Sequence, residues 1–304
     1  MVRGRHAAGP DYWTAKQQQT NHVSQFYQII DLIPSFLQYW FRYSYERLRR
    51  QTEHRGGNQP NLNSDVLREE RVPVPSRMEQ ERIAIRLRTL LAEVERARSS
   101  LEEQLKASDL LVDALLRESL SRSTEPPLHE CLREVTEGIG GDWAKYPVLG
   151  ATRSGLAPAK DPVGKNPERY KPVRLGTIFS NPMRILLGSI AMIDDQDTPG
   201  ITSPDYVVMR PVEKKLDARW FYYWFRSSYG AEFIKSLARG AVRERLLFKR
   251  LAPAQIRIPD WSSQQRFTAQ VREIRQFKEG LQRKLGAIEK LPAALLREAF
   301  SGRL

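Results

Sequence analysis

One stretch of the sequence occurs twice: Tyr39-Trp40-Phe41-Arg42-Tyr43-Ser44-Tyr45 returns as Tyr223-Trp224-Phe225-Arg226-Ser227-Ser228-Tyr229. The two copies align without a gap at an offset of 184 residues. The same register places Arg55-Gly56 on Arg239-Gly240, and it places Leu67, Pro75 and Gln80 on Leu251, Pro259 and Gln264. Chance would not keep one register over such a length, so the chain contains an internal repeat.

A second match lies near the end of each copy. Ala114-Leu115-Leu116-Arg117-Glu118 matches Ala294-Leu295-Leu296-Arg297-Glu298 at an offset of 180 residues. The offset has fallen by four residues, which is about one helical turn. We therefore expect the segment between the two matches to be a helix that is one turn shorter in the second copy.

These segments carry apolar residues at alternating spacings of four and three, with charged residues between them. Such a period of about 3.5 residues is typical of a coiled-coil seam. We predict two long helices, over residues 79–120 and 264–291, that pair antiparallel because the chain leaves the end of one and returns to start the other. A solitary amphipathic helix on a domain surface would show a similar stripe. The predicted helix-pairing residues are Leu87, Leu90, Val94, Val271, Leu281 and Leu285.

Two residues interrupt the second of these helices. Lys278 lies where the seam would call for an apolar residue. Pro292 is predicted to kink or break the helix near its end, because proline removes a backbone donor and clashes with the preceding turn.

The region between the two long helices has short β-rich runs at 148–150, 177–179, 188–193 and 206–209, separated by glycine, proline and aspartate. A helix is predicted over about residues 218–237, where Trp220, Tyr223, Trp224 and Phe233 fall at helical spacing. We interpret these aromatic residues as core packing, with a base-stacking platform as the alternative. The fold class is therefore α+β: a strand-rich domain plus two long antiparallel coiled-coil helices.

The net charge of +13 is unevenly distributed. Residues 143–260 carry 20 basic and 11 acidic side chains, whereas residues 76–142 carry 10 and 14. A polyanion, most plausibly nucleic acid, would therefore meet the strand-rich region first. The alternative is a basic surface that only keeps the protein soluble.

The basic and polar residues of this region gather in three connecting segments. Loops on a rigid scaffold often carry specific recognition, and arginine, asparagine and lysine are the side chains that contact bases and phosphates. Each residue alone could be a solvated charge. The DNA-binding candidates are Lys160, Lys165, Asn166, Arg169 and Lys171 in the first cluster, Asn181 and Arg184 in the second, and Arg239, Arg243 and Arg245 in the third. Arg184 and Arg243 are the candidates for base contact, with pairing of Arg243 to Glu244 as the structural alternative.

The order of several motifs resembles the specificity subunit of type I restriction-modification systems. The resemblance rests on Tyr170, Asn181-Pro182-Met183-Arg184, Gly188-Ser189-Ile190 and Ser203-Pro204-Asp205-Tyr206, on Gly240 with Arg243, on Glu79-Gln80-Glu81-Arg82-Ile83, and on the C-terminal run 291–304. It implies a remnant of a first target-recognition domain over residues 1–75, a first long helix over 76–123, a complete second target-recognition domain over 124–260, and a second long helix over 261–304.

The resemblance also implies the partners. They are double-stranded DNA, methyltransferase subunits docked on the helices and restriction subunits reached through the complex, whereas S-adenosylmethionine, ATP and magnesium are expected only on partner subunits. The first recognition domain departs from the pattern, because residues upstream of Asn21 leave no room for the counterpart of residues 128–204. We expect an N-terminally truncated subunit that the truncation impairs, with a functional half-subunit that dimerises as the alternative.

Catalytic patterns are missing from the sequence. The single cysteine, Cys131, excludes a disulfide framework and a cysteine-based zinc site, and it favours the cytoplasm. The four histidines lack metal-ligand spacing, and no phosphate-binding glycine loop is present. Asp194, Asp195 and Asp197 are interpreted as a solvated turn rather than a cation site. We therefore predict a non-catalytic subunit without membrane spans, with a helical protein-interaction scaffold without DNA specificity as the alternative.

Overall fold

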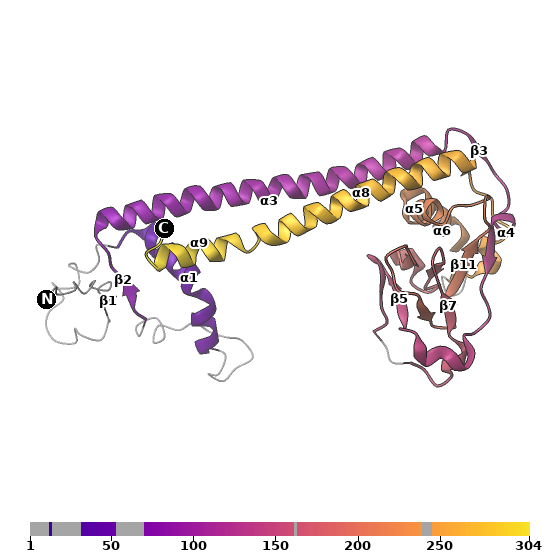
Figure 1. Cartoon of the computed structure of the whole chain (residues 1–304), viewed down its shortest axis with the longest axis horizontal. Helices are drawn as coiled ribbons and strands as arrows, with labels where there is room; N and C mark the ends of the chain where they lie inside the picture. Colours follow the sequence, from indigo (N-terminus) through magenta and orange to yellow (C-terminus); the bar gives the residue numbers. More distant parts are fainter. Residues whose placement is uncertain (1–11, 14–31, 53–69, 161–162, 239–244) are drawn as a thin grey trace, which may run out of the picture. The chain divides into compact units, whose positions relative to one another are not determined.

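The computed structural model describes residues 12–13, 32–52, 70–160, 163–238 and 245–304 (Figure 1). The chain divides into two compact units. Unit 1 comprises residues 1–105 and 279–304, and unit 2 comprises residues 106–278. Both long helices cross this division, so each unit contains a part of each helix.

The two long helices are confirmed, with ends within three residues of the predicted ones. They are α3 (Arg77–Ser119) and α8 (Trp261–Ile288). The predicted break is also confirmed, because α8 ends at Ile288 and a further helix, α9 (Leu291–Phe300), begins with Pro292 in its first turn. Proline is well tolerated there, since the first helical N–H groups have no partner within the helix. Within the described residues, no helix is long and apolar enough to cross a membrane.

The long helix α3 runs antiparallel to α8 in unit 2 and to α9 in unit 1. In unit 2 the ammonium of Lys278 pairs with the carboxylate of Asp109, and the amide of Asp260 donates to the carbonyl of Arg122 at 3.2 Å. In unit 1 Leu87 and Leu296 share a hydrophobic cluster, and the last residue, Leu304, accepts a hydrogen bond from Arg82 at 2.9 Å. Residue numbers thus rise along one helix as they fall along the other.

The predicted pairing residues fall into two groups. Leu87, Val271 and Leu281 are buried, whereas Leu90, Val94 and Leu285 are half-buried. A pair of helices covers each seam residue mainly from the partner's side, so residues at the margin of the seam keep some solvent contact. Lys278, at the unexpected polar position, is accommodated by its ion pair with Asp109.

Short strands and helices make up the rest of the two units. Unit 1 has β1 (Tyr12–Trp13), α1 (Pro34–Thr52) and β2 (Val72–Pro73), and β1 pairs antiparallel with β2. Unit 2 has β3 (Ser123–Thr124), α4 (Leu128–Cys131), β4 (Leu132–Glu134), η3 (Gly140–Lys145), β5 (Leu149–Thr152), β6 (Gly155–Pro158), η4 (Pro167–Arg169), β7 (Lys171–Val173), β8 (Ile178–Ser180), η5 (Ile185–Leu187), β9 (Ile190–Met192), β10 (Gly200–Thr202), β11 (Val207–Pro211), α5 (Ala218–Arg226), α6 (Ser228–Ala238), α7 (Phe248–Leu251) and β12 (Ile258–Pro259).

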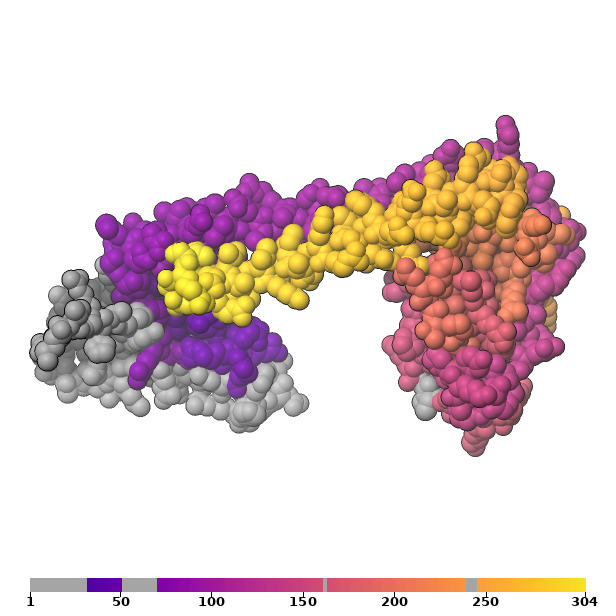
Figure 2. All heavy atoms as spheres, viewed as in Figure 1, coloured from indigo at the N-terminus to yellow at the C-terminus, as the bar shows by residue number. Residues whose placement is uncertain are grey.

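The central sheet of unit 2 has the antiparallel strand order β4-β11-β8-β9. Ile178, Met192 and Val207 join one hydrophobic cluster, while their sequence neighbours Phe179, Ala191 and Val208 join another. Neighbouring residues of a strand point to opposite faces, so both faces of this sheet are covered. The hairpin β5-β6 and the pair β10-β7 complete the strand-rich part, and Figure 2 shows the atoms of this part in magenta to orange.

The prediction of one helix over residues 218–237 is wrong in one respect: it is two helices, α5 and α6. Ser227 has an extended ψ of 175° and ends α5, and its hydroxyl donates to the carbonyl of Trp224 at 2.6 Å. A Cβ on Gly230 would lie 2.4 Å from the carbonyl oxygen of Phe225, so only glycine allows α6 to begin so close to α5. The core interpretation of the aromatic residues is confirmed, because Trp220 and Trp224 are buried.

The second sequence match corresponds to equivalent packing in the two units. Leu116, near the end of α3, lies in the core of unit 2 with Trp220 and Val271. Leu296, in α9, lies in the core of unit 1 with Phe36 and Leu87. Figure 1 shows α9 beside α1 in unit 1. Each core is therefore completed by the end of the long helix from the other copy.

A buried glutamine makes the same set of hydrogen bonds in both copies. Gln80, in the first turn of α3, accepts a hydrogen bond from the amide of Ile33 at 2.9 Å and donates to the carbonyl of Pro75 at 3.0 Å. Gln264, in the first turn of α8, accepts from the amide of Asp217 at 2.6 Å and donates to the carbonyl of Pro259 at 2.9 Å.

The two partners of Gln80, Ile33 and Pro75, align with Asp217 and Pro259, the partners of Gln264, at the offset of 184 residues. The helices α1 and α5 begin directly after Ile33 and Asp217, so their first residues also align. We call this arrangement the glutamine joint. Gln80 is 0% exposed and Gln264 is 1% exposed. Each joint ties the start of an aromatic helix and the end of a short strand to the first turn of a long helix, which confirms the repeat in three dimensions.

Replacing Gln264 with alanine should destabilise unit 2. The amide of Asp217 and the carbonyl of Lys215, which Gln264 also bonds at 3.2 Å, would lose their partner. Each polar group left unsatisfied costs about 1–3 kcal/mol. We expect a loss of at least about 2 kcal/mol in urea unfolding, together with faster hydrogen exchange of the Asp217 amide.

The matched control is the neighbouring residue Gln265, which is exposed and donates one hydrogen bond to the carboxylate of Asp217. Gln265→Ala should cost less than about 1 kcal/mol. Equal losses of unfolding free energy in Gln264→Ala and Gln265→Ala would show that the glutamine joint contributes no more to stability than an exposed glutamine does.

Candidate nucleic-acid interface

The first cationic cluster lies on an exposed segment with a fixed backbone. Lys165, Asn166 and Arg169 are exposed around η4, and Lys160 is exposed just after β6. The buried Tyr170 anchors the segment: its hydroxyl accepts from the amide of Gly164 at 2.9 Å, and its carbonyl accepts from the amide of Ile139 at 2.7 Å. The side chains are therefore displayed to solvent from a backbone that is held in place.

Lys171 is placed differently from the other cations of this cluster. Its ammonium is half-buried and donates to the carbonyl of Tyr206 at 2.8 Å, which ties β7 to the segment before β11. Burial lowers the pKa of the Lys171 ammonium, while the nearby charges of Glu134 and Asp205 act in the opposite direction. This placement gives Lys171 a structural contact and leaves its contact with DNA a prediction.

The second cluster is a tight loop between β8 and β9. The side-chain oxygen of Asn181 accepts from the amide of Met183 at 3.0 Å, and the carbonyl of Asn181 accepts from the amide of Arg184 at 3.0 Å. Asn181 thus shapes the turn with its side chain. Arg184 is exposed and available to a partner.

The structure brings the third cluster to this loop. The amide of Leu246 donates to the carbonyl of Pro182 at 3.2 Å, and the exposed Arg245 places its guanidinium 3.4 Å from the sulfur of Met183. Arg184 and Arg245, more than sixty positions apart in the sequence, therefore share one surface. The other predicted residues of this cluster, Arg239 and Arg243, lie outside the described residues, as does Gly240.

Arg226, which helps to position this surface, was not predicted as a site residue from the sequence. Arg226, at the end of α5, donates to the carbonyl of Ile190 at 2.7 Å and to the carbonyl of Arg153 at 2.6 Å. It thereby holds the start of β9 and the β5-β6 turn together. The repeat singled out Arg226, because this residue aligns with Arg42. No sequence pattern indicated that Arg226 would bond backbone carbonyls.

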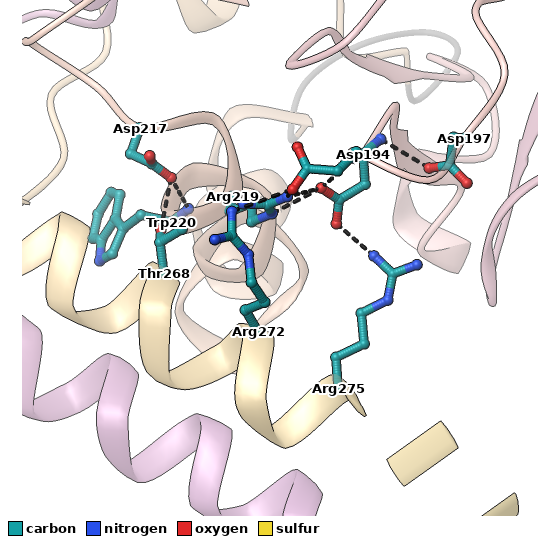
Figure 3. A network of polar contacts seen from close by, with 9 residues as sticks. Asp194, Asp197, Asp217, Arg219, Trp220, Thr268, Arg272 and Arg275 are labelled. Carbon is teal, nitrogen blue, oxygen red and sulfur yellow. Dashed lines mark hydrogen bonds and ion pairs between the residues drawn. The ribbon is translucent and has the colours of Figure 1, made fainter. Parts of the chain in front are cut away.

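A network of ion pairs joins the loop after β9 to two helices (Figure 3). Asp194 accepts from Arg219 of α5 at 2.8 Å and pairs with Arg275 of α8, and Asp195 pairs with Arg219 and with Arg272 of α8. The Asp194 side chain is only 12% exposed. The turn is present, since the amide of Asp197 donates to the carbonyl of Asp194 at 3.0 Å, and Asp195 is 51% exposed. The interpretation as a solvated turn is wrong for Asp194, which Arg219 and Arg275 cover.

Pairing with arginines compensates the charge of Asp194 and Asp195. Burial by itself would raise the pKa of Asp194, but hydrogen bonds from Arg219 and the Asp195 amide and the charges of Arg219 and Arg275 outweigh it, so the pKa lies below its ordinary value. Within the part of the chain that the structure describes, no group of three or more histidine, cysteine or acidic residues is placed to hold a metal ion.

The network extends the glutamine joint along α8. Asp217 caps α5 by accepting from the amide of Trp220 at 2.9 Å, and it also accepts from the hydroxyl of Thr268 at 2.8 Å. Figure 3 shows Thr268, Arg272 and Arg275 projecting from α8 toward α5 and the loop that carries Asp194. The residues from Gln264 to Arg275 thus hold the strand-rich part of unit 2 on the long helix.

The comparisons with known proteins agree with this architecture. Residues 4–106 match the family model for the type I restriction modification DNA specificity domain. A comparison with curated proteins found no match. Among solved structures, the HsdS subunit from Thermoanaerobacter tengcongensis has a TM-score of 0.53 and 19% identity, covering 90% of this chain and 71% of that chain.

Two further solved structures have the same fold. The S subunit of a type I restriction-modification system from M. genitalium has a TM-score of 0.51 and 17% identity, covering 88% of this chain and 73% of that chain. A structure from work on complex assembly and conformational transition of the type I R-M system has a TM-score of 0.62 and 17% identity, covering 89% and 72%. The resemblance to specificity subunits, and the fold class, are confirmed.

Replacing Asp194 with asparagine should destabilise unit 2 at neutral pH. The variant loses a charged acceptor for Arg219 and Arg275, and a hydrogen bond to a charged group contributes about 1.5–3 kcal/mol. Because the folded pKa of Asp194 lies below its ordinary value, this stabilisation is present above about pH 4 and is lost as the pH falls through the folded pKa. Urea unfolding should therefore show a smaller difference between wild type and variant at pH 3 than at pH 7.

The control is Asp142→Asn, which removes the exposed ion pair between Asp142 and Lys145. Exposed pairs contribute little, so this variant should unfold like the wild type at both pH values. A loss for Asp194→Asn that persists unchanged at pH 3 would contradict the electrostatic account.

Proposed function

We propose that this chain is the subunit that gives a type I restriction-modification complex its DNA target specificity. The observation that carries the proposal is the match of residues 4–106 to the DNA specificity domain, with the fold of specificity subunits over most of the chain. The exposed cations of unit 2 support it, because they are displayed on anchored loops in the region with the largest positive charge.

The division of labour follows from this proposal. Lys160, Lys165, Arg169, Arg184 and Arg245 would contact double-stranded DNA, and the long helices would dock the methyltransferase subunits. Methyl transfer from S-adenosylmethionine and ATP- and magnesium-dependent cleavage would take place on the methyltransferase and restriction subunits. This chain would then act without a catalytic site of its own.

Phosphate contacts position a protein on the duplex, and contacts to base edges supply sequence specificity. Lys165 and Arg169 suit the first task, since both are exposed on one short segment. Arg184 suits the second, since it projects from a turn whose backbone is fixed by hydrogen bonds. Fixed backbones reduce the entropy that is lost on binding.

The variant Lys165→Ala/Arg169→Ala should bind random-sequence duplex DNA less tightly and with a weaker dependence on salt. Each phosphate contact contributes about 0.9 to the slope of log affinity against log salt concentration, so losing two should reduce the slope by about 1.8. A gel-shift titration at several salt concentrations measures this slope. Lys171 is left unchanged because its ammonium is bonded to Tyr206.

Lys284→Ala is the control, because Lys284 is an exposed cation on α8 outside residues 124–260. Its slope should equal that of the wild type. An unchanged slope in the double variant would exclude Lys165 and Arg169 from phosphate contact. Wild-type chain that retains no DNA at any salt concentration would favour the alternative function, a helical scaffold that binds proteins.

A further inference from the structure

Exposed apolar side chains gather at one place in the strand-rich region. Among the described residues of 124–260, the large exposed hydrophobic side chains are Leu175, Met183, Leu186, Leu187, Tyr229 and Leu247. Three of them lie in the loop between β8 and β9, and Leu247 follows the residue that bonds Pro182 of the same loop. Met183 is 60% exposed and Leu187 is 69% exposed. Scattered exposed leucines are ordinary, but a cluster on one short loop indicates a contact surface.

The loop is rigid, so these side chains are not exposed through disorder. Ile185, in its middle, is buried in the main core of unit 2. The buried Ser189 donates its hydroxyl hydrogen to the carbonyl of Ala151. Gly188 has a φ of +80°, a left-handed conformation that suits glycine and lets the chain turn directly after η5. The backbone thus presents Met183 and Leu187 in one fixed arrangement.

Arginines from three segments lie on or beside this loop. Arg184 lies within the loop, and Arg245 contacts the sulfur of Met183. Arg153 lies beside Gly188, where a Cβ would be 3.8 Å from its side chain. Segments 151–156, 181–189 and 245–251 contain no aspartate or glutamate. We call this surface the arginine-rimmed loop, and its charge is complementary to a polyanion.

We propose that the arginine-rimmed loop recognises A·T base pairs in double-stranded DNA by packing Met183 and Leu187 against thymine methyl groups, while its arginines contact neighbouring phosphates. The inference rests on the proposed function and names the chemical group that this loop recognises. Leucine cannot hydrogen-bond a base edge, and the thymine methyl is the apolar group that the major groove displays.

The test starts from a random duplex library, from which the full-length wild-type chain selects its preferred sequence. Each thymine of that sequence is then replaced in turn by deoxyuridine, which removes only the methyl group and keeps the base pair. Burying one methyl corresponds to about a fourfold change in affinity. Replacing thymine by deoxyuridine should lower the affinity of the wild-type chain about fourfold at one or two positions.

Three variants complete the test. Met183→Ser/Leu187→Ser and the milder Leu187→Ala should bind thymine and deoxyuridine duplexes with nearly equal affinity at those positions. Leu175→Ser is the matched control, because Leu175 is 64% exposed and lies outside the loop. This variant should lose as much affinity on deoxyuridine replacement as the wild type does. All variants should melt at the wild-type temperature, and Leu187→Ala decides the result if the double variant does not fold.

The outcomes separate this inference from the proposed function. A wild-type chain that selects no sequence would contradict both. A selected sequence without A·T pairs, or a deoxyuridine effect that is absent from wild type or survives in the loop variants, would overturn the inference alone. Loop variants that bind DNA like the wild type but no longer co-elute with a methyltransferase subunit would show that the loop contacts protein instead.

Discussion

The hydrogen bonds of two buried glutamines determine how the rest of the structure is assembled. Gln80 and Gln264 each fix the angle at which an aromatic helix and a short strand meet a long helix. A buried amide side chain is costly unless its donors and acceptor are all satisfied, so this geometry tolerates little variation. The two cores are then closed by Leu296 in unit 1 and Leu116 in unit 2, each supplied by the end of the other copy's helix.

In unit 2 the constraint extends from the joint to the proposed DNA-binding loops through a single short helix. The start of α5 is held on α8 by Asp217, which accepts from Thr268, and Arg219 of α5 shares the carboxylate of Asp194 with Arg275 of α8. At the other end of α5, Arg226 bonds the carbonyls of Ile190 and Arg153. The loop that carries Met183 and Arg184 is therefore positioned by the same elements that form the core, which favours binding because little order has to be gained on contact.

The sequence predicted much of the fold because its signals are local or repeated. The spacing of leucines predicted α3 and α8, Pro292 predicted the break near the end of the second long helix, and the repeat register aligned Gln80 with Gln264. The break at Ser227 was missed because its cause is the close packing of Gly230 on Phe225, which helical periodicity does not record. The pairing of Asp194 with Arg219 and Arg275, and the contact of Arg245 with Met183, were missed because they join residues far apart in the chain.

The central claim is that this chain supplies the DNA sequence specificity of a methyltransferase complex. The most direct measurement is a map of methylated bases in cells that express a type I methyltransferase subunit from the same source with and without this chain. The account predicts methylation at one defined sequence motif only when both proteins are present. Methylation that is equally frequent and has the same motif without this chain would contradict the account.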